Sequence, residues 1–227
     1  MSVKKKQLNL QNSLFPQYSI IMPTQIKNSK IAGVVLAGGR ARRMANQDKG
    51  LIQFKNRALI SYALEALRAV SDLTFINANR NLIAYEAFGL PVITDQTHSF
   101  DGPLAGILTT LIHTNAELLL VMPCDTPFFK AEHLQQLLTA RAVHDADVAI
   151  AFDGVQRHPL FLALKTSLAK NLHDYLASGQ RKVGDWLKSL NSVNVDFSHE
   201  PAIFININTP DELAAFEAQD KYLEKSR

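Results

Sequence analysis

The stretch IAGVVLAGGRARRMANQDK, residues 31–49, decides how this chain folds. Its first six residues form an apolar run that predicts a buried strand, and this run leads directly into Gly38 and Gly39. Glycines at such a turn let backbone N–H groups approach an anion, and the arginines and the lysine that follow add positive charge. The pattern predicts a strand that ends in a phosphate-binding loop.

The composition fits a small globular enzyme and argues against several other classes. Of the 227 residues, 47% are hydrophobic and 20% are charged, and the net charge is +3. This mild charge argues against a nucleic-acid binder, since the basic residues gather in Lys4–Lys6 and the opening loop. No apolar run approaches the length of a membrane span. The single cysteine, Cys124, excludes an internal disulfide and fits a reducing cytoplasm.

Residues 1–30 differ in character from the remainder of the chain. They mix lysine, glutamine, asparagine and proline with scattered apolar residues, and no helical or strand period is sustained. We expect a flexible N-terminal extension over residues 1–30. Residues 31–227 show no internal repeat and no low-complexity linker, so we expect them to form one domain.

Apolar runs of strand length alternate with helical patterns from Ile31 onward. This alternation predicts an α/β fold, in which helices cover both faces of one mostly parallel, Rossmann-like sheet as a three-layer α/β/α sandwich. The apolar run at Leu118–Met122 is expected to be a central strand buried on both faces. The strands are predicted at 31–36, 73–78, 90–94, 118–122 and 146–152, and the helices at 58–70, 82–88, 106–113 and 130–143.

Polar residues follow four of the predicted strands. In sheets of this kind the ligand lies outside the carboxyl ends of the strands, so these residues are expected to meet at one edge. They are the Gly-Arg loop, Asn77 with Asn79 and Arg80, Asp95, and the segment Pro123-Cys124-Asp125-Thr126-Pro127.

Gly38 and Gly39 are also compatible with a tight turn that has no function. The loop lacks the third glycine of the dinucleotide fingerprint and the Gly-Lys-Ser/Thr ending of the P-loop. Its arginines and Lys49 could form a solvated surface. The position of the loop directly after a buried strand favours phosphate binding.

Asp125 is the strongest candidate for a metal ligand. It is either an early helix cap or a hard oxygen ligand for Mg²⁺ beside phosphate oxygens, and its place at a buried strand end favours the metal. For Asp95, a nucleotide contact and a simple turn remain equally open. Cys124 is expected to be a packed thiol, because no base or helix N-terminus follows it closely.

The same residues resemble the molybdenum cofactor guanylyltransferases. The resemblance runs in order from about Ile31 to Phe216 and does not cover residues 1–30. It is carried by LAGG (36–39), RM (43–44), DK (48–49), GPLAG (102–106), PCDTP (123–127) and NINTPDEL (206–213). The family belongs to the nucleotidyltransferases with a Rossmann-like sheet, and its members transfer GMP from Mg-GTP to the terminal phosphate of molybdopterin, releasing pyrophosphate.

The resemblance implies roles for individual residues on the donor side, in the N-terminal part of the domain. The turn would contact the guanine nucleotide, Lys49 would bind its phosphates, and Asp125 would hold Mg²⁺. The donor residues so implied are Leu36, Ala37, Gly38, Gly39, Lys49, Asn77, Asp95 and Asp125. Ala45 stands where the family usually carries glycine, so the loop can hold this residue only at a negative φ.

The predicted chemistry needs positioning and charge neutralisation more than covalent help. The attacking phosphate of molybdopterin is already an anion, so no general base is required. We expect Arg43 and Lys49 to steady the phosphates and the departing pyrophosphate, and Mg²⁺ on Asp125 to neutralise charge. These three residues are the predicted catalytic set.

The C-terminal part is expected to bind the molybdopterin acceptor. His158 lies in a segment, Arg157–Phe161, that would cover the pocket from a loop-to-strand junction. Arg181 is expected either to meet the acceptor phosphate or to stabilise a helix end, with neither favoured. The alternation of Asn206-Ile207-Asn208 predicts a strand with both asparagines on one face, and the resemblance supports cofactor binding by them. Thr209 is expected to cap the last helix.

Two alternative functions remain open. One is a sibling enzyme that uses CTP on the same acceptor, although the Ala37-Gly38-Gly39 turn resembles the guanine-using branch. The other is a non-catalytic nucleotide-binding partner in cofactor insertion, against which Lys49 and Asp125 argue. Molybdenum-insertion proteins and apo-molybdoenzymes are the expected protein partners.

Overall fold

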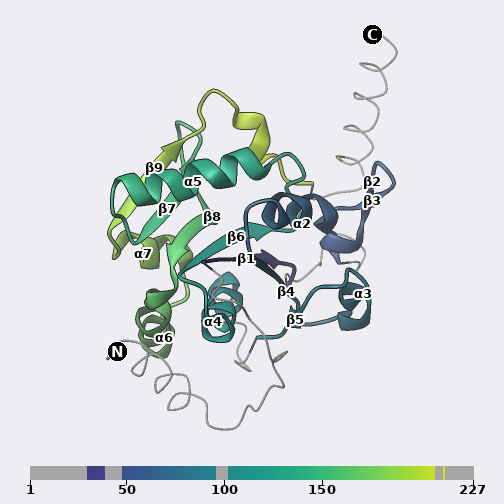
Figure 1. Cartoon of the computed structure of the whole chain (residues 1–227), viewed down its shortest axis with the longest axis horizontal. Coiled ribbons are helices and arrows are strands. Elements are labelled where there is room, and N and C mark those ends of the chain that lie inside the picture. Colours follow the sequence, from purple (N-terminus) through teal and green to yellow (C-terminus); the bar gives the residue numbers. More distant parts are fainter. Residues whose placement is uncertain (1–29, 39–47, 96–101, 208–211, 213–227) are drawn as a thin grey trace.

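The structure of the protein is a computed structural model that describes residues 30–38, 48–95, 102–207 and 212. The predicted extension, apart from Lys30, lies outside these residues. So do Gly39, Arg43, Ala45, Asn208 and Thr209. The described residues form the helices and strands shown in Figure 1.

A seven-stranded, mostly parallel sheet forms the centre of the molecule. Its strand order is β5-β4-β1-β6-β8-β7-β9, and β8 alone among these runs antiparallel to its neighbours. A separate hairpin is formed by β2 and β3. The strands are β1 (Ile31–Leu36), β2 (Gln53–Phe54), β3 (Arg57–Ala58), β4 (Leu73–Asn77), β5 (Val92–Ile93), β6 (Leu118–Pro123), β7 (Val148–Phe152), β8 (Arg157–Lys165) and β9 (Ser192–Asp196).

Helices cover both faces of this sheet, which confirms the predicted three-layer arrangement. In Figure 1, α2 and α5 lie above the sheet, and α4 and α6 lie below it. One layer contains α2 (Ile60–Arg68), α3 (Leu82–Glu86) and α5 (Ala131–Val143), and the other contains α4 (Pro103–His113), α6 (Ala169–Ala177) and α7 (Val183–Lys188). Three short 3₁₀ turns complete the fold: η1 (Lys49–Leu51), η2 (Thr166–Leu168) and η3 (Pro201–Phe204).

Alternate residues of each central strand enter opposite layers of the core. In β6, Leu120 and Met122 pack under α2 and α5, whereas Leu119 and Val121 pack against α4 and its neighbours. All four side chains are completely buried, as expected for a strand covered on both sides. The prediction of a central strand over Leu118–Met122 is therefore confirmed. No described helix has the length and apolar character to cross a membrane.

Several element boundaries differ from the sequence prediction, most clearly at the start of α4. Helix α4 begins at Pro103, three residues before the predicted Gly106, because Gly102 with φ +65 ends the preceding loop and proline fits the first helical turn. The predicted loop-to-strand junction at Arg157–Phe161 is the start of the long strand β8.

The prediction of a strand at Asn206-Ile207-Asn208 is wrong for Asn206 and Ile207, the two of these residues that the structure describes. Residues 205–207 follow the 3₁₀ turn η3 and form no strand. The backbone N–H of Ile207 instead donates to the carbonyl oxygen of Asp125 over 3.0 Å. Ile207 is therefore bonded to a loop and not to the neighbouring strand that the predicted alternation would require.

The connections locate the ligand-binding edge of the sheet. From β1 the chain crosses by α2 to β4 on one side, and it later returns by α4 to β6 on the other side of β1. The strand order therefore reverses between β1 and β6. In α/β sheets, ligands bind at such a switch point, beyond the carboxyl ends of the strands.

Candidate active site

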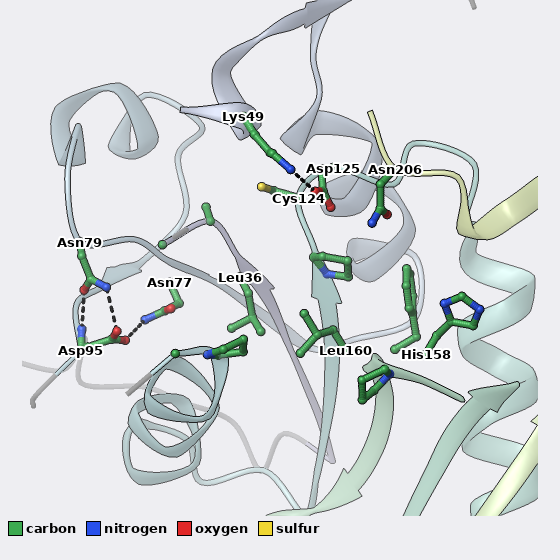
Figure 2. Close-up of a pocket in the computed structure, with 17 residues that line it drawn as sticks. Leu36, Lys49, Asn77, Asn79, Asp95, Cys124, Asp125, His158, Leu160 and Asn206 are labelled. Atoms are coloured by element: carbon green, nitrogen blue, oxygen red, sulfur yellow. Dashed lines mark hydrogen bonds and ion pairs between the residues drawn. The ribbon is translucent and has the colours of Figure 1, made fainter. Parts of the chain in front are cut away.

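A cavity of about 690 Å³ lies at the carboxyl ends of β1, β4 and β6. Nine of the residues predicted from the sequence line it: Leu36, Ala37, Gly38, Lys49, Asn77, Asp95, Asp125, His158 and Asn206. The convergence of strand ends predicted from the sequence is thus present in the structure. The other lining residues are Asn79, Gly102, Pro103, Pro123, Cys124, Pro159, Leu160 and Phe161 (Figure 2).

The turn after β1 is held close to β4. The backbone N–H of Ala37 donates to the carbonyl oxygen of Asn77 over 2.8 Å, which extends the parallel pairing beyond Leu36. At Gly38 a Cβ atom would lie 3.1 Å from Nδ2 of Asn79, closer than most side-chain contacts. Glycine therefore keeps the backbone of this turn near the cavity wall, where N–H groups can face a phosphate or a base.

Asp95 is clamped by two asparagines of the neighbouring strand end. Nδ2 of Asn77 donates to its Oδ1 over 2.9 Å, and Nδ2 of Asn79 donates to its Oδ2 over 2.7 Å. The backbone N–H of Asp95 donates to Oδ1 of Asn79 over 2.8 Å. The carboxylate is fixed in orientation at one end of the cavity (Figure 2), where its remaining lone pairs can accept from N–H or O–H groups.

Helix α4 brings its N-terminal end to the same part of the cavity. Gly102 and Pro103 line the cavity, and a helix N-terminus favours negative charge. Gly106 packs directly against the asparagine clamp, since a Cβ atom there would lie 2.2 Å from Oδ1 of Asn77. The second glycine of the GPLAG segment, Gly106, is therefore needed for close packing of α4 on the strand end.

Lys49 and Asp125 meet at the centre of the cavity edge. Nζ of Lys49 lies 3.1 Å from Oδ2 of Asp125, and their side chains are 29% and 14% exposed. Lys49 begins the turn η1, and Asp125 follows the end of β6, so two separate segments bring these charges together. The pair combines a cation for phosphates with a carboxylate that a divalent cation can use.

Cys124 beside Asp125 is a packed thiol. It is buried, and burial is the main cause that raises the pKa of its thiol to about 12. A thiol with this pKa stays protonated at neutral pH and is a poor nucleophile. The interpretation of Cys124 as a packing residue agrees with this position.

His158 stands at the opposite end of the cavity from Asp95. Its ring stacks on Phe204 with 3.7 Å between centroids, and its Nε2 lies 2.8 Å from Oδ2 of Asp153. The N–H groups of Gln156 and Val155, together with His158, hold the pKa of Asp153 down at about 2. Because Asp153 is then a carboxylate, Nε2 of His158 carries the proton and donates it.

An apolar wall adjoins His158. Pro159, Leu160 and Phe161 of β8 line this end of the cavity, and Asn206 lies beside Asp125 at its margin (Figure 2). The cavity thus has a polar end near Asp95, a charged centre at Lys49 and Asp125, and a largely apolar end. One extended ligand, or two ligands side by side, would contact polar, charged and apolar side chains at successive positions along the cavity.

Arg181 does not line this cavity. Its Nη1 donates to the carbonyl oxygens of Leu176 and Gln180, over 2.6 and 2.7 Å, at the C-terminal end of α6. Gly179, with φ +85, ends that helix. These contacts match the helix-end alternative, and a role for Arg181 toward the acceptor stays a prediction.

The sequence predicts Asn79 at this edge of the sheet but assigns it no binding role, whereas in the structure it orients Asp95. It lies two residues after Asn77, and the alternation of an extended segment could have placed both amides on one side. Leu160 and Pro159 carry no chemical signal of their own. No group of three or more histidine, cysteine, aspartate or glutamate side chains suited to a metal occurs among the described residues.

Comparisons with known proteins agree with this geometry. Residues 33–194 match the family of the MobA-like NTP transferase domain. A molybdenum cofactor guanylyltransferase of Shewanella halifaxensis is 40% identical over 184 residues, 81% of this chain and 92% of the relative. One from Shewanella baltica is 40% identical over 185 residues, 82% of this chain and 94% of the relative.

The fold also resembles solved structures. The crystal structure of molybdopterin-guanine dinucleotide biosynthesis protein A from Archaeoglobus fulgidus has a TM-score of 0.69 and 27% identity, over 84% of this chain and 99% of the other. Fold, cavity and family match together define a nucleotidyltransferase. Within that class, the chain belongs to the molybdenum cofactor guanylyltransferase family.

Proposed function

We propose that this protein transfers GMP from GTP to the terminal phosphate of molybdopterin and releases pyrophosphate. The main support for this proposal is the order in which polar, charged and apolar side chains follow one another along one cavity. Asp95 lies at one end, Lys49 with Asp125 at the centre, and His158 at the other end (Figure 2). The names of the relatives, which are guanylyltransferases of the molybdenum cofactor, support GTP as donor and molybdopterin as acceptor.

The nucleoside of the donor would lie at the Asp95 end. The clamped carboxylate accepts hydrogen bonds, so it suits the N–H or O–H donors of a nucleoside, and Asn77 and Asn79 hold it in place. The turn at Leu36–Gly38 and, beyond the described residues, Gly39 would add backbone contacts. The N-terminal end of α4 contributes a favourable dipole for the phosphates.

Lys49 would neutralise charge on the triphosphate and on the departing pyrophosphate. Its ammonium lies at the cavity edge beside Asp125 and has no need to be buried for this role. Arg43, outside the described residues, is proposed to act with it. Since the acceptor phosphate is an anion, the residues must align it and need not remove a proton from it.

The donor set around Asp125 fits Mg²⁺ that arrives with the nucleotide. Mg²⁺ is commonly bound by one or two carboxylates together with phosphate oxygens, and Asp125 offers one partly exposed carboxylate that faces the cavity. When bound, Mg²⁺ would supply charge neutralisation of the phosphates. We therefore propose that Asp125 holds the ion.

The acceptor would lie at the His158 end. The apolar wall of Pro159, Leu160 and Phe161 suits the flat pterin ring, and the amide of Asn206 can bond its polar edge. Because the Nε2 proton of His158 is donated to Asp153, the ring is held by this bond and by its stack on Phe204. Asn208 and Arg181 complete the acceptor residues that we propose from the sequence.

We also propose that the protein acts in the cytoplasm and that its product is delivered to molybdenum-insertion proteins and apo-molybdoenzymes.

The decisive experiment incubates the purified chain with molybdopterin, Mg²⁺ and either GTP or CTP. Pyrophosphate release and the mass of the dinucleotide are measured. We expect product with GTP only. Product with CTP alone would make the enzyme a cytidylyltransferase, and no pyrophosphate with either nucleotide would make it a binding protein.

A further inference from the structure

The residue that precedes Lys49 carries a buried carboxylate. The side chain of Asp48 is 1% exposed, whereas that of Lys49 is 29% exposed and lines the cavity. A carboxylate leaves water only at a large cost unless it is paired and hydrogen-bonded. Asp48 does not line the cavity, so contact with a ligand there does not account for its burial.

Two side chains of the loop after β4 pair with this carboxylate. Arg80 forms an ion pair with Oδ1 of Asp48, and Nδ2 of Asn81 donates to its Oδ2 over 2.8 Å. Each carboxylate oxygen therefore has a partner from the same short loop. Such a pair forms only when this loop and the residues around Asp48 are both in place.

Asn81 is used for this contact and not for capping. It is the N-cap residue of α3, yet its side chain makes no hydrogen bond to the helix. Asparagine at an N-cap normally accepts from a helix N–H. Its backbone is left-handed, with φ 51 and ψ 34, a conformation that asparagine tolerates better than most residues. The local geometry thus favours the contact to Asp48 over the capping of α3.

Asp48 directly precedes the turn η1, so the position of its backbone sets the position of the Lys49 backbone. Its carbonyl oxygen accepts the N–H of Leu51 over 3.0 Å. Gly50 packs tightly against Tyr85, since a Cβ atom at this position would lie 3.0 Å from Oη of Tyr85. The backbone of Lys49 is therefore held between an anchored residue and a tightly packed one.

The segment 77–81, at the end of β4 and just after it, contacts two carboxylates near the proposed donor half of the cavity. Asn77 and Asn79 hold Asp95, and Arg80 and Asn81 hold Asp48. Four side chains of the segment 77–81 thus contact these two carboxylates, so the segment links Asp95 to the residue that precedes Lys49.

We propose that Arg80 is a positioning residue for the transfer reaction. By pairing with Asp48 it holds Lys49 so that its ammonium lies beside Asp125 and toward the phosphates of the nucleoside triphosphate. Because Lys49 is a phosphate ligand only under the proposed function, this role of Arg80 rests on that function.

The first test replaces the ion pair as a unit. Removing Arg80 alone would leave a buried, unpaired carboxylate, so the variant is Asp48→Asn with Arg80→Met, which leaves no buried charge. We expect a folded protein whose kcat/KM for GTP falls about 10-fold to 100-fold, since small misplacements of a catalytic group have such effects. The matched control, Arg57→Met with Glu65→Gln, removes an exposed ion pair and should leave kcat/KM unchanged.

A double-mutant cycle with Lys49→Ala separates positioning from stability. If Arg80 acts through Lys49, the same pair replacement made on top of Lys49→Ala should change kcat/KM by less than about threefold. Losses that multiply in the combined variant would overturn the proposal.

Hydrogen exchange provides a readout that needs no turnover. In the pair variant, the backbone N–H of Leu51 should exchange faster than in the wild type, and it should be unchanged in the Arg57 control. Equal exchange in all three proteins would overturn the proposal. Absence of product in the wild type with GTP and CTP would instead refute the proposed function, and exchange would still decide whether Arg80 holds the Lys49 turn.

Discussion

Ile207 and Asp125 are joined by a backbone hydrogen bond of 3.0 Å, donated by the N–H of Ile207 to the carbonyl oxygen of Asp125. This bond ties the segment that carries Asn206 to the segment that carries the central carboxylate of the cavity. The side chain of Ile207 is fully buried and packs with Phe54 and Leu59, near the β2–β3 hairpin. The segments that carry Asn206 and Asp125, which we propose for acceptor and metal binding, are thus held to each other through the backbone.

Truncation of this side chain should therefore affect both stability and turnover. We expect Ile207→Ala to lower the free energy of unfolding by about 2–4 kcal/mol, because a buried cavity remains. Turnover should fall as Asn206 and Asp125 lose their common support. Ile207→Val is the matched control and should cost about 1 kcal/mol. Urea unfolding and kcat measure the two effects, and a folded Ile207→Ala enzyme with full kcat would argue against the coupling.

Lys49 and Asp125 should be needed for turnover and not for folding. We expect Lys49→Ala and Asp125→Ala each to lower kcat by about 100-fold or more, since the first removes the proposed cation for the phosphates and the second the proposed ligand for Mg²⁺. The thermal midpoint should change little, because both side chains are partly exposed. Lys188→Ala removes an exposed ion pair with Asp185 and serves as the control. Near-normal pyrophosphate release by either variant would contradict the assignment.

A methyl group at Gly106 should disrupt the clamp on Asp95. The Cβ of Gly106→Ala would lie 2.2 Å from Oδ1 of Asn77, so the amide must move away from Asp95. We expect weaker GTP binding and a loss of about 1–3 kcal/mol in stability from overpacking. Calorimetry with GTP measures the affinity.

Gly184 in α7 offers the matched substitution for that experiment. No atom lies within 4 Å of a Cβ built there, so Gly184→Ala should raise the stability by up to about 1 kcal/mol and leave GTP affinity unchanged. Equal GTP affinity of the Gly106→Ala variant and the wild type would show that the clamp is not part of the donor site.

Asp153 should make the stability pH-dependent in the acid range. Its folded pKa of about 2 lies below the ordinary value of 3.8, because Gln156, His158 and Val155 donate to the carboxylate. A depressed pKa means that the folded protein binds fewer protons, so this contribution is present above about pH 4 and is lost as the pH falls toward 2.

Asp153→Asn tests this assignment. The variant should have a lower thermal midpoint than the wild type at neutral pH, and the difference should shrink as the pH falls below about 4. A difference that stays constant down to about pH 2 would mean that His158 and the turn N–H groups do not stabilise the carboxylate of Asp153.

Much of the fold could be predicted because its signals are local. β1 and β6 are continuous apolar runs, and burial on both faces requires such runs. The proposed donor half of the cavity was also predictable, since parallel strands carry their following residues to one edge. Asn77, Asp95 and Asp125 lie there for that reason.

What could not be predicted depends on contacts between distant segments. Asn206 and Ile207 alternate as in a strand, but the partner of Ile207 is the loop carbonyl of Asp125, which no local pattern encodes. Asp48 has no local sequence signal for burial, which depends on contacts with the distant residues Arg80 and Asn81. Arg181 was left undecided because helix ends and phosphates attract the same side chain.

The antiparallel direction of β8 has a consequence for how such enzymes can diversify. Because β8 runs against β6, its first residues, including His158, reach the same edge as the last residues of β1 and β6. The preceding β7–β8 turn is open to solvent, with Val155 90% exposed. Insertions in this turn would therefore change the proposed acceptor end of the cavity, while the parallel strands would keep the proposed donor end unchanged.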